Sequence, residues 1–390
     1  MSAARPASST AAPAWDRPKY DVVLLGAILA LVAVGIVIVY SASAVYAGAR
    51  FHDGAFFLKR QLAFAAVGVL LLAAMMRLDY HLLRKLAYPL LVASFVLVAL
   101  TFVPGLGARV NGAQRWLRLP GMRFQPSELA KIALCVYLAR SVGDKGEALK
   151  DFKIGLLPHF IVVGVFAAML LAQPDFGTMI VFVVLTLLVL FVAGARLTYV
   201  FVSLGALVPV AWLLITHSAY RMRRIEAFLH PFQDRFGKGW QVAEALMSIG
   251  SGGIVGVGLG AGREKLGFLP EGHTDYILAS LGEELGLIGI ALVLGLFAVV
   301  VWRGLKAARE APDPFGAFLA FGLTALFVIE TSINAGMCMG LLPSKGIALP
   351  FLSYGGTSLV KSMLAGGILL SISGGGGGYL KPAAGAVRCT

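Results

Sequence analysis

The sequence predicts an all-α integral membrane protein, and its composition and hydropathy pattern carry that prediction. Of 390 residues, 58% are hydrophobic and only 14% are charged, and the mean hydropathy is +0.84. A bilayer core about 30 Å thick needs roughly 20 mostly apolar residues for each spanning helix. Hydropathy and the charged breaks place ten transmembrane helices, at residues 22–46, 61–76, 86–103, 126–140, 154–172, 177–194, 198–216, 275–302, 315–339 and 353–373.

The ten spans leave no soluble domain of useful size. Residues 1–20, rich in Ala, Ser and Pro, are expected to form a disordered cytoplasmic tail. Residues 21–373 form the membrane domain, and residues 374–390, which open with five glycines, are expected to form a flexible cytoplasmic tail. Three scattered cysteines indicate neither a disulfide framework nor a metal site.

The short loops set the orientation of the spans, because cytoplasmic loops carry an excess of Lys and Arg. With the N-terminus inside, that excess is met by Arg77, Arg84, Lys85, Arg140, Lys145, Lys150, Lys153, Arg196, Arg303, Lys306 and Arg309. Both termini are then cytoplasmic, and a large loop between spans seven and eight, residues 217–275, lies outside. The net charge of +13 partly reflects this rule, so it predicts no nucleic-acid partner.

Two external loops are nevertheless strongly basic. The loop at 104–125 holds four arginines and no acid, namely Arg109, Arg115, Arg118 and Arg123. The large loop holds seven basic residues, namely Arg221, Arg223, Arg224, Arg235, Lys238, Arg263 and Lys265. Arginine side chains bind phosphates through paired hydrogen bonds. The two loops therefore predict an anionic ligand, a phosphate or pyrophosphate, at the outer surface.

Ionisable residues also occur at the ends of spans four and six. Glu128 and Lys131 lie three residues apart at the start of span four and can form an ion pair on one helix face. An acid near a helix N-terminus has a sufficient structural explanation in the helix dipole, so both interpretations of Glu128 stay open. Asp175, in the external turn before span six, is either a helix cap or part of a site.

Three carboxylates fall in the region of span eight. Asp275 lies at its external mouth, where it would be accessible to a substrate or would cap the helix. Glu283 and Glu284 lie about two turns deeper and point to different sides of the helix. The three carboxylates of this span therefore cannot all face lipid. The alternating glycines from Gly256 to Gly262 lack the strand–turn–helix context of a phosphate loop and favour a mobile loop or close helix packing.

Glu330 and Lys361 are charges within spans nine and ten. Each lies roughly 12–14 Å below the outer end of its span, at 1.5 Å of rise per residue. An unpaired charge at that depth is expensive. We therefore predict a structural Glu330–Lys361 ion pair.

Taken together, these segments resemble the SEDS family (shape, elongation, division and sporulation) over roughly residues 20–373. The resemblance is carried by short motifs in the family's order: Asn111–Trp116, Gln125–Lys131, Gln173–Thr178, Tyr220-Arg221 with Arg224, Pro270–Asp275, Gly282–Gly286, Gly340–Gly346 and Leu349–Gly356. Ser344-Lys345-Gly346 and the Tyr40–Ser43 end of span one are more similar to the division and sporulation branch than to the elongation branch.

The resemblance implies a peptidoglycan glycosyltransferase that polymerises lipid II, an undecaprenyl-pyrophosphate-linked disaccharide-pentapeptide. Asp275 matches the family's catalytic aspartate, which acts as general base. Arg221 and Arg224, with Lys131 and Arg115, would stabilise the departing pyrophosphate. Glu128 would orient Lys131. The expected substrate-binding residues are therefore Arg221, Arg224, Lys131, Glu128, Trp116, Arg115, Asp175 and Lys345.

The resemblance also implies partners and a location. The partners are a cognate class B penicillin-binding protein and other division proteins, at the septum of the bacterial cytoplasmic membrane. A divalent cation, Mg²⁺ or Mn²⁺, on the pyrophosphate is an expectation, although no ligand cluster in the sequence demands one. The alternatives are a lipid II flippase, an elongation-type polymerase and a non-catalytic division scaffold. A transporter should place its polar groups near mid-membrane, whereas most here lie outside.

Overall fold

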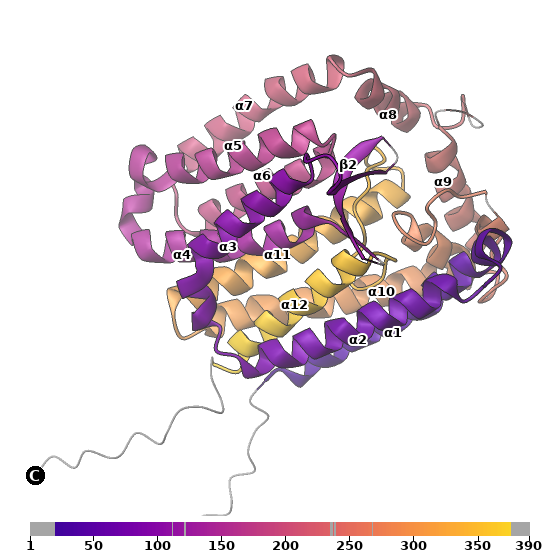
Figure 1. Cartoon of the computed structure of the whole chain (residues 1–390), viewed down its shortest axis with the longest axis horizontal. Helices are drawn as coiled ribbons and strands as arrows, with labels where there is room; N and C mark the ends of the chain where they lie inside the picture. The colour runs from indigo at the N-terminus through magenta and orange to yellow at the C-terminus, as the bar shows by residue number, and fades with distance from the viewer. Residues whose placement is uncertain are drawn as a thin grey trace, which may run out of the picture.

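The computed structural model describes residues 20–375, except residues 111, 121, 235, 236, 238 and 267. The two expected tails, together with Arg235 and Lys238, therefore lie almost wholly outside the described residues. Within them the chain forms twelve α-helices, one small sheet and a few single helical turns. The helices pack side by side into one bundle (Figure 1), in which α4, α11 and α12 are the most enclosed.

Ten of the helices coincide with the ten predicted spans. They are α1 (Val22–Phe51), α2 (Phe56–Arg77), α3 (His81–Leu100), α4 (Pro126–Lys145), α5 (Leu157–Ala172), α6 (Phe176–Val192), α7 (Leu197–Thr216), α10 (Ile277–Glu310), α11 (Pro314–Cys338) and α12 (Gly356–Ser373). Eight of the described helices are long and apolar enough to cross a membrane, with α5 counted together with the helical turn Phe152–Leu156 that precedes it. The other two are α6, which has 17 residues, and α4, which carries several charges. The chain is thus a multi-pass membrane protein, and the count of ten spans stays a prediction.

The segment 104–125, expected to be a loop, instead forms an antiparallel sheet with the strand order β1-β2-β3. Its strands are β1 (Gly107–Val110), β2 (Ala113–Leu119) and β3 (Met122–Phe124), with Ala108 opposite Trp116 and Leu117 opposite Phe124. The all-α prediction was wrong here, because the four arginines lower the hydropathy of the segment, and low hydropathy does not distinguish a strand from a loop.

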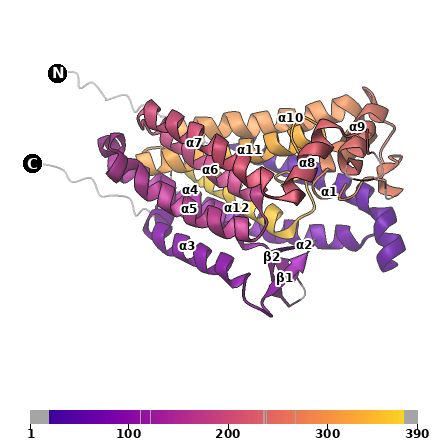
Figure 2. The same cartoon turned by 90° about the horizontal axis from the view of Figure 1, so that it is seen from above.

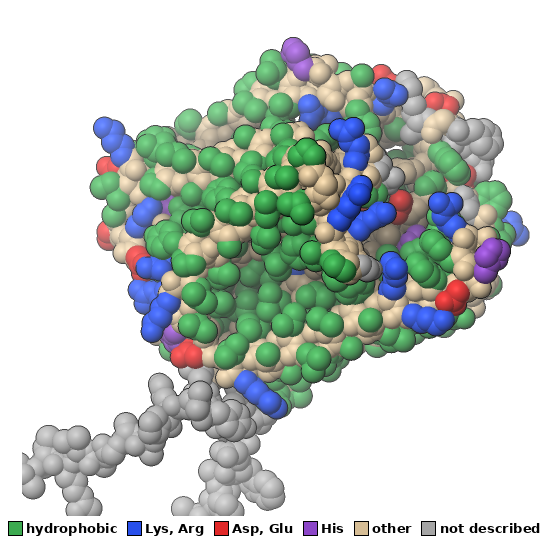
Figure 3. Space-filling view, in the orientation of Figure 1, with side chains coloured by type: hydrophobic (Ala, Val, Ile, Leu, Met, Phe, Trp, Pro, Cys, Tyr) green, Lys and Arg blue, Asp and Glu red, His purple; other side chains and the backbone are tan. Residues whose placement is uncertain are grey.

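The large loop 217–275 also contains regular structure. Its first part forms α8 (Ala219–Leu229), its middle forms α9 (Trp240–Gly252), and Glu264–Leu266 form a single helical turn, η3. In both cartoon views α8, α9 and the sheet lie toward the same end of the bundle (Figures 1 and 2). Basic side chains gather around a hollow at that end, beside a broad hydrophobic face (Figure 3).

Helix α10 is broken at Gly286, whose φ of 66° and ψ of −164° suit only glycine. The segment 253–258 packs against the break and hydrogen-bonds with the backbone groups that the break leaves without helical partners. The amides of Val257 and Gly258 donate to the carbonyls of Glu283 and Glu284, each at 3.0 Å. A Cβ on Gly256 would lie 2.2 Å from the Glu284 oxygen. The alternating glycines thus serve close packing against α10, one of the two roles that the sequence favoured.

Candidate functional site

A cavity of about 2130 Å³ opens at the end of the bundle that carries the sheet and α8. Its walls come from α1, α2, α5, α6 and α7, from the sheet, and from the segments before α10 and after α11. Eight of the nine predicted site residues line it, all except Lys131. Glu128 reaches it from α4, and the other seven reach it from those elements and from α8. The eight are Arg115, Trp116, Glu128, Asp175, Arg221, Arg224, Asp275 and Lys345. The fold therefore brings together residues spread over some 230 positions of the chain.

Asp275 lies in this cavity just before α10. It does not cap the helix, because Tyr276 occupies the N-cap position and makes no side-chain cap hydrogen bond. The Asn334 amide of α11 donates to the Asp275 backbone oxygen and to the Ile347 oxygen, each at 2.8 Å. Gly346 approaches the carboxylate so closely that a Cβ there would lie 3.2 Å from Asp275 Oδ2. The backbone of Asp275 is thus hydrogen-bonded to α11, and its carboxylate lies next to Gly346, where a side chain would crowd it.

Burial and, to a smaller extent, the charge of Glu271 raise the pKa of Asp275 to about 7, although the charges of Arg224 and Arg115 act in the opposite direction. Desolvation disfavours the charged form of a carboxyl group, and a nearby anion does the same. A carboxylate with a pKa near 7 is well suited to accept and release a proton at physiological pH. The environment of Asp275 is therefore that of a general base.

Three cations lie on the α7–α8 side of the cavity. Arg221 donates to the Leu214 oxygen at 2.8 Å, and Arg224 donates to the Ser344 oxygen at 2.6 Å. Lys345 Nζ lies 4.9 Å from the centre of the Phe176 ring. Burial and the charge of Arg224 lower the pKa of Lys345 to about 8. Each cation retains hydrogen-bonding capacity for an anionic ligand.

The sheet brings Arg115 to the same cavity. Its guanidinium donates to the Pro174 oxygen and lies 3.8 Å from the Asp175 carboxylate. Asp175 accepts hydrogen bonds from the Thr178 amide at 3.2 Å and from its hydroxyl at 2.9 Å, so it caps α6. Asp175 is thus a helix cap that also lines the cavity, and its role in a site stays a prediction. Trp116 follows on β2 and lines the wall.

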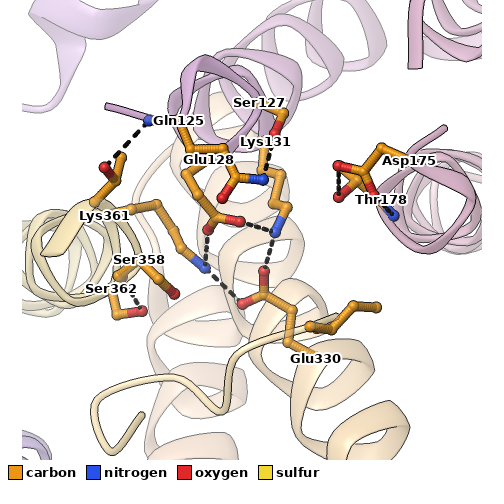
Figure 4. Close-up of polar contacts among 12 residues, drawn as sticks. Gln125, Ser127, Glu128, Lys131, Asp175, Thr178, Glu330, Ser358, Lys361 and Ser362 are labelled. Atoms are coloured by element: carbon orange, nitrogen blue, oxygen red, sulfur yellow. Dashed lines mark hydrogen bonds and ion pairs between the residues drawn. The ribbon is translucent and has the colours of Figure 1, made fainter. Parts of the chain in front are cut away.

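Lys131 is the predicted site residue that the structure does not bring to the cavity. It is 2% exposed, and its ammonium lies 2.6 Å from Glu128 Oε1 and 2.7 Å from Glu330 Oε1 (Figure 4). Direct contact with a pyrophosphate was therefore a wrong expectation for Lys131, because two carboxylates already occupy its ammonium. The predicted Glu330–Lys361 ion pair is present at 2.6 Å.

Sequence reasoning missed several residues of the cavity wall. Arg60 of α2 lies over the Phe56 ring at 4.5 Å, and His273 packs against Phe57 at 4.7 Å between ring centres. The only sequence signal for Arg60 was a charge at the edge of a span. Glu264 also lines the cavity; burial raises its pKa to about 9, and Glu283 lies beside it.

Among the described residues, no group of three or more His, Cys, Asp or Glu side chains is placed to hold a metal ion. The expected divalent cation would be bound by the substrate's pyrophosphate, so its presence stays a prediction.

Comparison with known proteins matches residues 22–375 to the FtsW, RodA and SpoVE family, described as cell cycle proteins. The probable peptidoglycan glycosyltransferase FtsW of Trichlorobacter lovleyi is 49% identical over 357 residues, which cover 92% of this chain and 94% of that protein. The stage V sporulation protein E of Bacillus subtilis is 41% identical over 354 residues, which cover 90% and 96%.

Solved structures agree with these relatives. A chain from a peptidoglycan synthase complex that coordinates polymerization and crosslinking superposes with a TM-score of 0.75 at 29% identity, covering 90% of this chain and 97% of that one. The rod shape determining protein RodA of Thermus thermophilus superposes with a TM-score of 0.65 at 28% identity, covering 92% and 98%. The chain belongs to the FtsW, RodA and SpoVE family, the SEDS family that its motifs resemble.

Proposed function

We propose that this protein is the FtsW-type peptidoglycan glycosyltransferase of its cell, which polymerises lipid II into β-1,4-linked glycan strands during division. The observation that carries the proposal is Asp275, a carboxylate with a pKa of about 7 set among cations in one large cavity. Relatives that are 45–49% identical are named probable peptidoglycan glycosyltransferase FtsW, which supports the reaction and the division role.

The proposed topology has ten spans with both termini in the cytoplasm. The positive-inside rule supports it, because the connections opposite the cavity carry most of the basic residues of the short loops. The cavity then faces the outer side of the bacterial cytoplasmic membrane. A lipid-linked substrate can reach it from the bilayer, since apolar residues of α6 and α7, such as Val183 and Leu214, form part of its wall.

In the proposed reaction, Asp275 takes the proton from the 4-hydroxyl of the acceptor GlcNAc. The hydroxyl oxygen attacks the anomeric carbon of the lipid-linked growing chain, and the bond from that carbon to the pyrophosphate oxygen breaks. Because the displacement has one step, the α-linked donor gives a β-linked product. Undecaprenyl pyrophosphate leaves with the bonding electron pair.

The departing pyrophosphate gains negative charge as this bond breaks. Arg221, Arg224, Arg115 and Lys345 line the same cavity as Asp275 and would stabilise that charge. They need little rearrangement, since backbone oxygens already fix both Arg224 and Arg221. Trp116 supplies a flat surface against which a sugar ring can pack.

A lipid II flippase, the alternative function, would use charged groups along a path through the membrane. Three charges within the described spans, Lys131, Glu330 and Lys361, are paired with one another and do not line the cavity. This arrangement favours the enzyme. The FtsW names of the relatives likewise favour division over an elongation-type role.

The proposed partner is a class B penicillin-binding protein that cross-links the new strands, together with other division proteins at the septum. Its support is the solved relative in a complex that coordinates polymerization and crosslinking.

Purified protein in detergent or nanodiscs, given labelled lipid II, tests the function directly. Wild type is expected to produce glycan strands that lysozyme digests, and Asp275→Ala is expected to produce none. Strand synthesis by both proteins would remove Asp275 from the reaction, and synthesis by neither would favour the flippase, which fluorescent lipid II in vesicles would then reveal.

A further inference from the structure

Four buried side chains close a ring of alternating charges between α4, α11 and α12 (Figure 4). Lys131 bridges Glu128 and Glu330 at 2.6 and 2.7 Å. Lys361 bridges the other two oxygens, at 2.6 Å to Glu330 and 3.2 Å to Glu128. Each ammonium thus lies between two carboxylates, and each carboxylate between two ammoniums, so the ring is electrically balanced. Glu330 and Lys361 were predicted from their sequence positions to pair with each other only. In the structure they are instead two members of this four-residue ring.

The ring touches the cavity at one point. Lys131, Glu330 and Lys361 are 2%, 1% and 0% exposed, whereas Glu128 is 7% exposed and lines the cavity. The Glu128 carboxylate is therefore the part of the ring that a ligand can sense. Each of its oxygens faces a different ammonium, so removal of a charge elsewhere in the ring changes the net charge beside the cavity.

We infer that Glu330 and Lys361 act on the cavity through Glu128: together they keep the wall on which this side chain lies electrically neutral toward an anionic ligand. The inference rests on the proposed function in that the ligand is a lipid pyrophosphate. Without Lys361 the ring carries one net negative charge beside the cavity, and without Glu330 it carries one net positive charge. Because electrostatic interactions are strong in a poorly screened interior, these changes alter anion affinity in opposite directions.

The ring itself is tested by thermal unfolding of two double variants. Glu330→Gln/Lys361→Met removes one pair and leaves Glu128 with Lys131, a balanced couple. The charge swap Glu330→Lys/Lys361→Glu keeps that pair but places Lys131 against a lysine and Glu128 against a glutamate. The ring predicts that the swap unfolds at a lower temperature than the neutral double variant. A swap as stable as wild type would show an isolated pair and overturn the inference.

The coupling to the cavity is tested by the affinity for undecaprenyl pyrophosphate in nanodiscs. Lys361→Met is expected to weaken binding about five- to tenfold and Glu330→Gln to tighten it by a similar factor, while Glu330→Gln/Lys361→Met binds like wild type. Misfolding cannot produce effects of opposite sign. Weaker binding in both single variants, or no change in either, would reduce the ring to a structural role.

The binding and unfolding experiments still decide between the two roles of the ring if one variant or the probe fails. If Lys361→Met does not accumulate in the membrane, Glu330→Gln and the neutral double variant still give the sign of the effect. If wild type does not bind undecaprenyl pyrophosphate, the proposed substrate is refuted and the coupling with it, while the unfolding comparison still decides whether the ring exists.

Discussion

Replacing Asp275 by asparagine removes the ability to accept a proton while keeping the shape of the side chain. The backbone contacts of this position, the Asn334 hydrogen bond above all, are unaffected by the change. The variant is therefore expected to reach the membrane in a folded state. Any loss of polymerisation then reports the chemistry of the carboxylate.

The size of the loss follows from the role of the group. A positioned general base typically contributes about 10²–10⁴-fold to the rate, which corresponds to roughly 3–5 kcal/mol of barrier. Strand synthesis from labelled lipid II, measured as an initial rate, should fall by that factor. The affinity for lipid II should change little, because the cations that face the pyrophosphate remain.

The pH dependence gives an independent check on the same residue. A base must be ionised to act, and the pKa of Asp275 is about 7. The wild-type rate should therefore rise with pH, from about a tenth of its plateau at pH 6 to about half at pH 7. The residual rate of Asp275→Asn should lack this rise.

As pH rises from about 4 to 7, the contribution of Asp275 to folding stability should fall while the rate of strand synthesis rises. The folded-state pKa of about 7 lies above the ordinary value of 3.8, so the folded protein binds the proton more tightly than the unfolded chain. This carboxyl group therefore costs stability as pH rises from about 4 to 7, by at most about 4 kcal/mol and less where water reaches it. Asp275→Asn should unfold at a higher temperature than wild type at pH 8, and the difference should vanish near pH 4.

These expectations separate a base from a structural group. A variant with near-normal strand synthesis would show that Asp275 does not transfer the proton. A variant that is inactive and also less stable than wild type at pH 8 would show instead that the carboxylate holds the fold together. Asp144→Asn, at an exposed position on α4, is the matched control: it weakens only surface ion pairs with Arg84 and Arg140, so it should leave strand synthesis unchanged and cost less than about 1 kcal/mol of stability.

Three further substitutions have defined outcomes. Glu271→Gln removes the anion that raises the pKa of the proposed base, so the acid limb of the rate profile should move to lower pH; an unchanged limb would contradict this. Arg224→Ala should weaken lipid II binding by about 1.5–3 kcal/mol in a binding titration, whereas the exposed Arg223→Ala, one position away, should not; equal effects would indicate diffuse surface charge. Gly286→Ala should destabilise by about 1–3 kcal/mol or more in thermal unfolding, because its Cβ would lie 2.4 Å from a backbone nitrogen, whereas Gly295→Ala, in the same helix with open space around it, should be neutral.

Hydropathy and the charged breaks were enough to place the ten helices that overlap the predicted spans, because a bilayer-spanning segment must be apolar along most of its length, but they missed α8 and α9. Local spacing was enough for the Glu128–Lys131 pair, and depth arithmetic for the Glu330–Lys361 pair. That these two pairs close into one ring could not be predicted. It depends on how α4 is rotated against α11 and α12, which neither hydropathy nor spacing determines.

Prediction from the sequence was less accurate for charged residues that take part in regular structure or in buried ion pairs. The arginines of 104–125 obscured a sheet, and Lys131 was assigned to the cavity because its charge suited a pyrophosphate. A cation's type indicates what it can bind, but its packing decides what it does bind, and Lys131 packs against two carboxylates. Arg60 had no motif around it, so only the fold could place it at the cavity wall.

The Asn334 side chain has a mechanical consequence. One amide group binds the carbonyl of Asp275 and the carbonyl of Ile347, which lies two residues from Lys345. The two chain segments are thereby fastened to the same point on α11, one carrying the proposed base and the other a cation. A rotation or axial shift of α11 moves base and cation together as one rigid piece, so their separation is preserved while their position relative to the sheet and Arg115 changes.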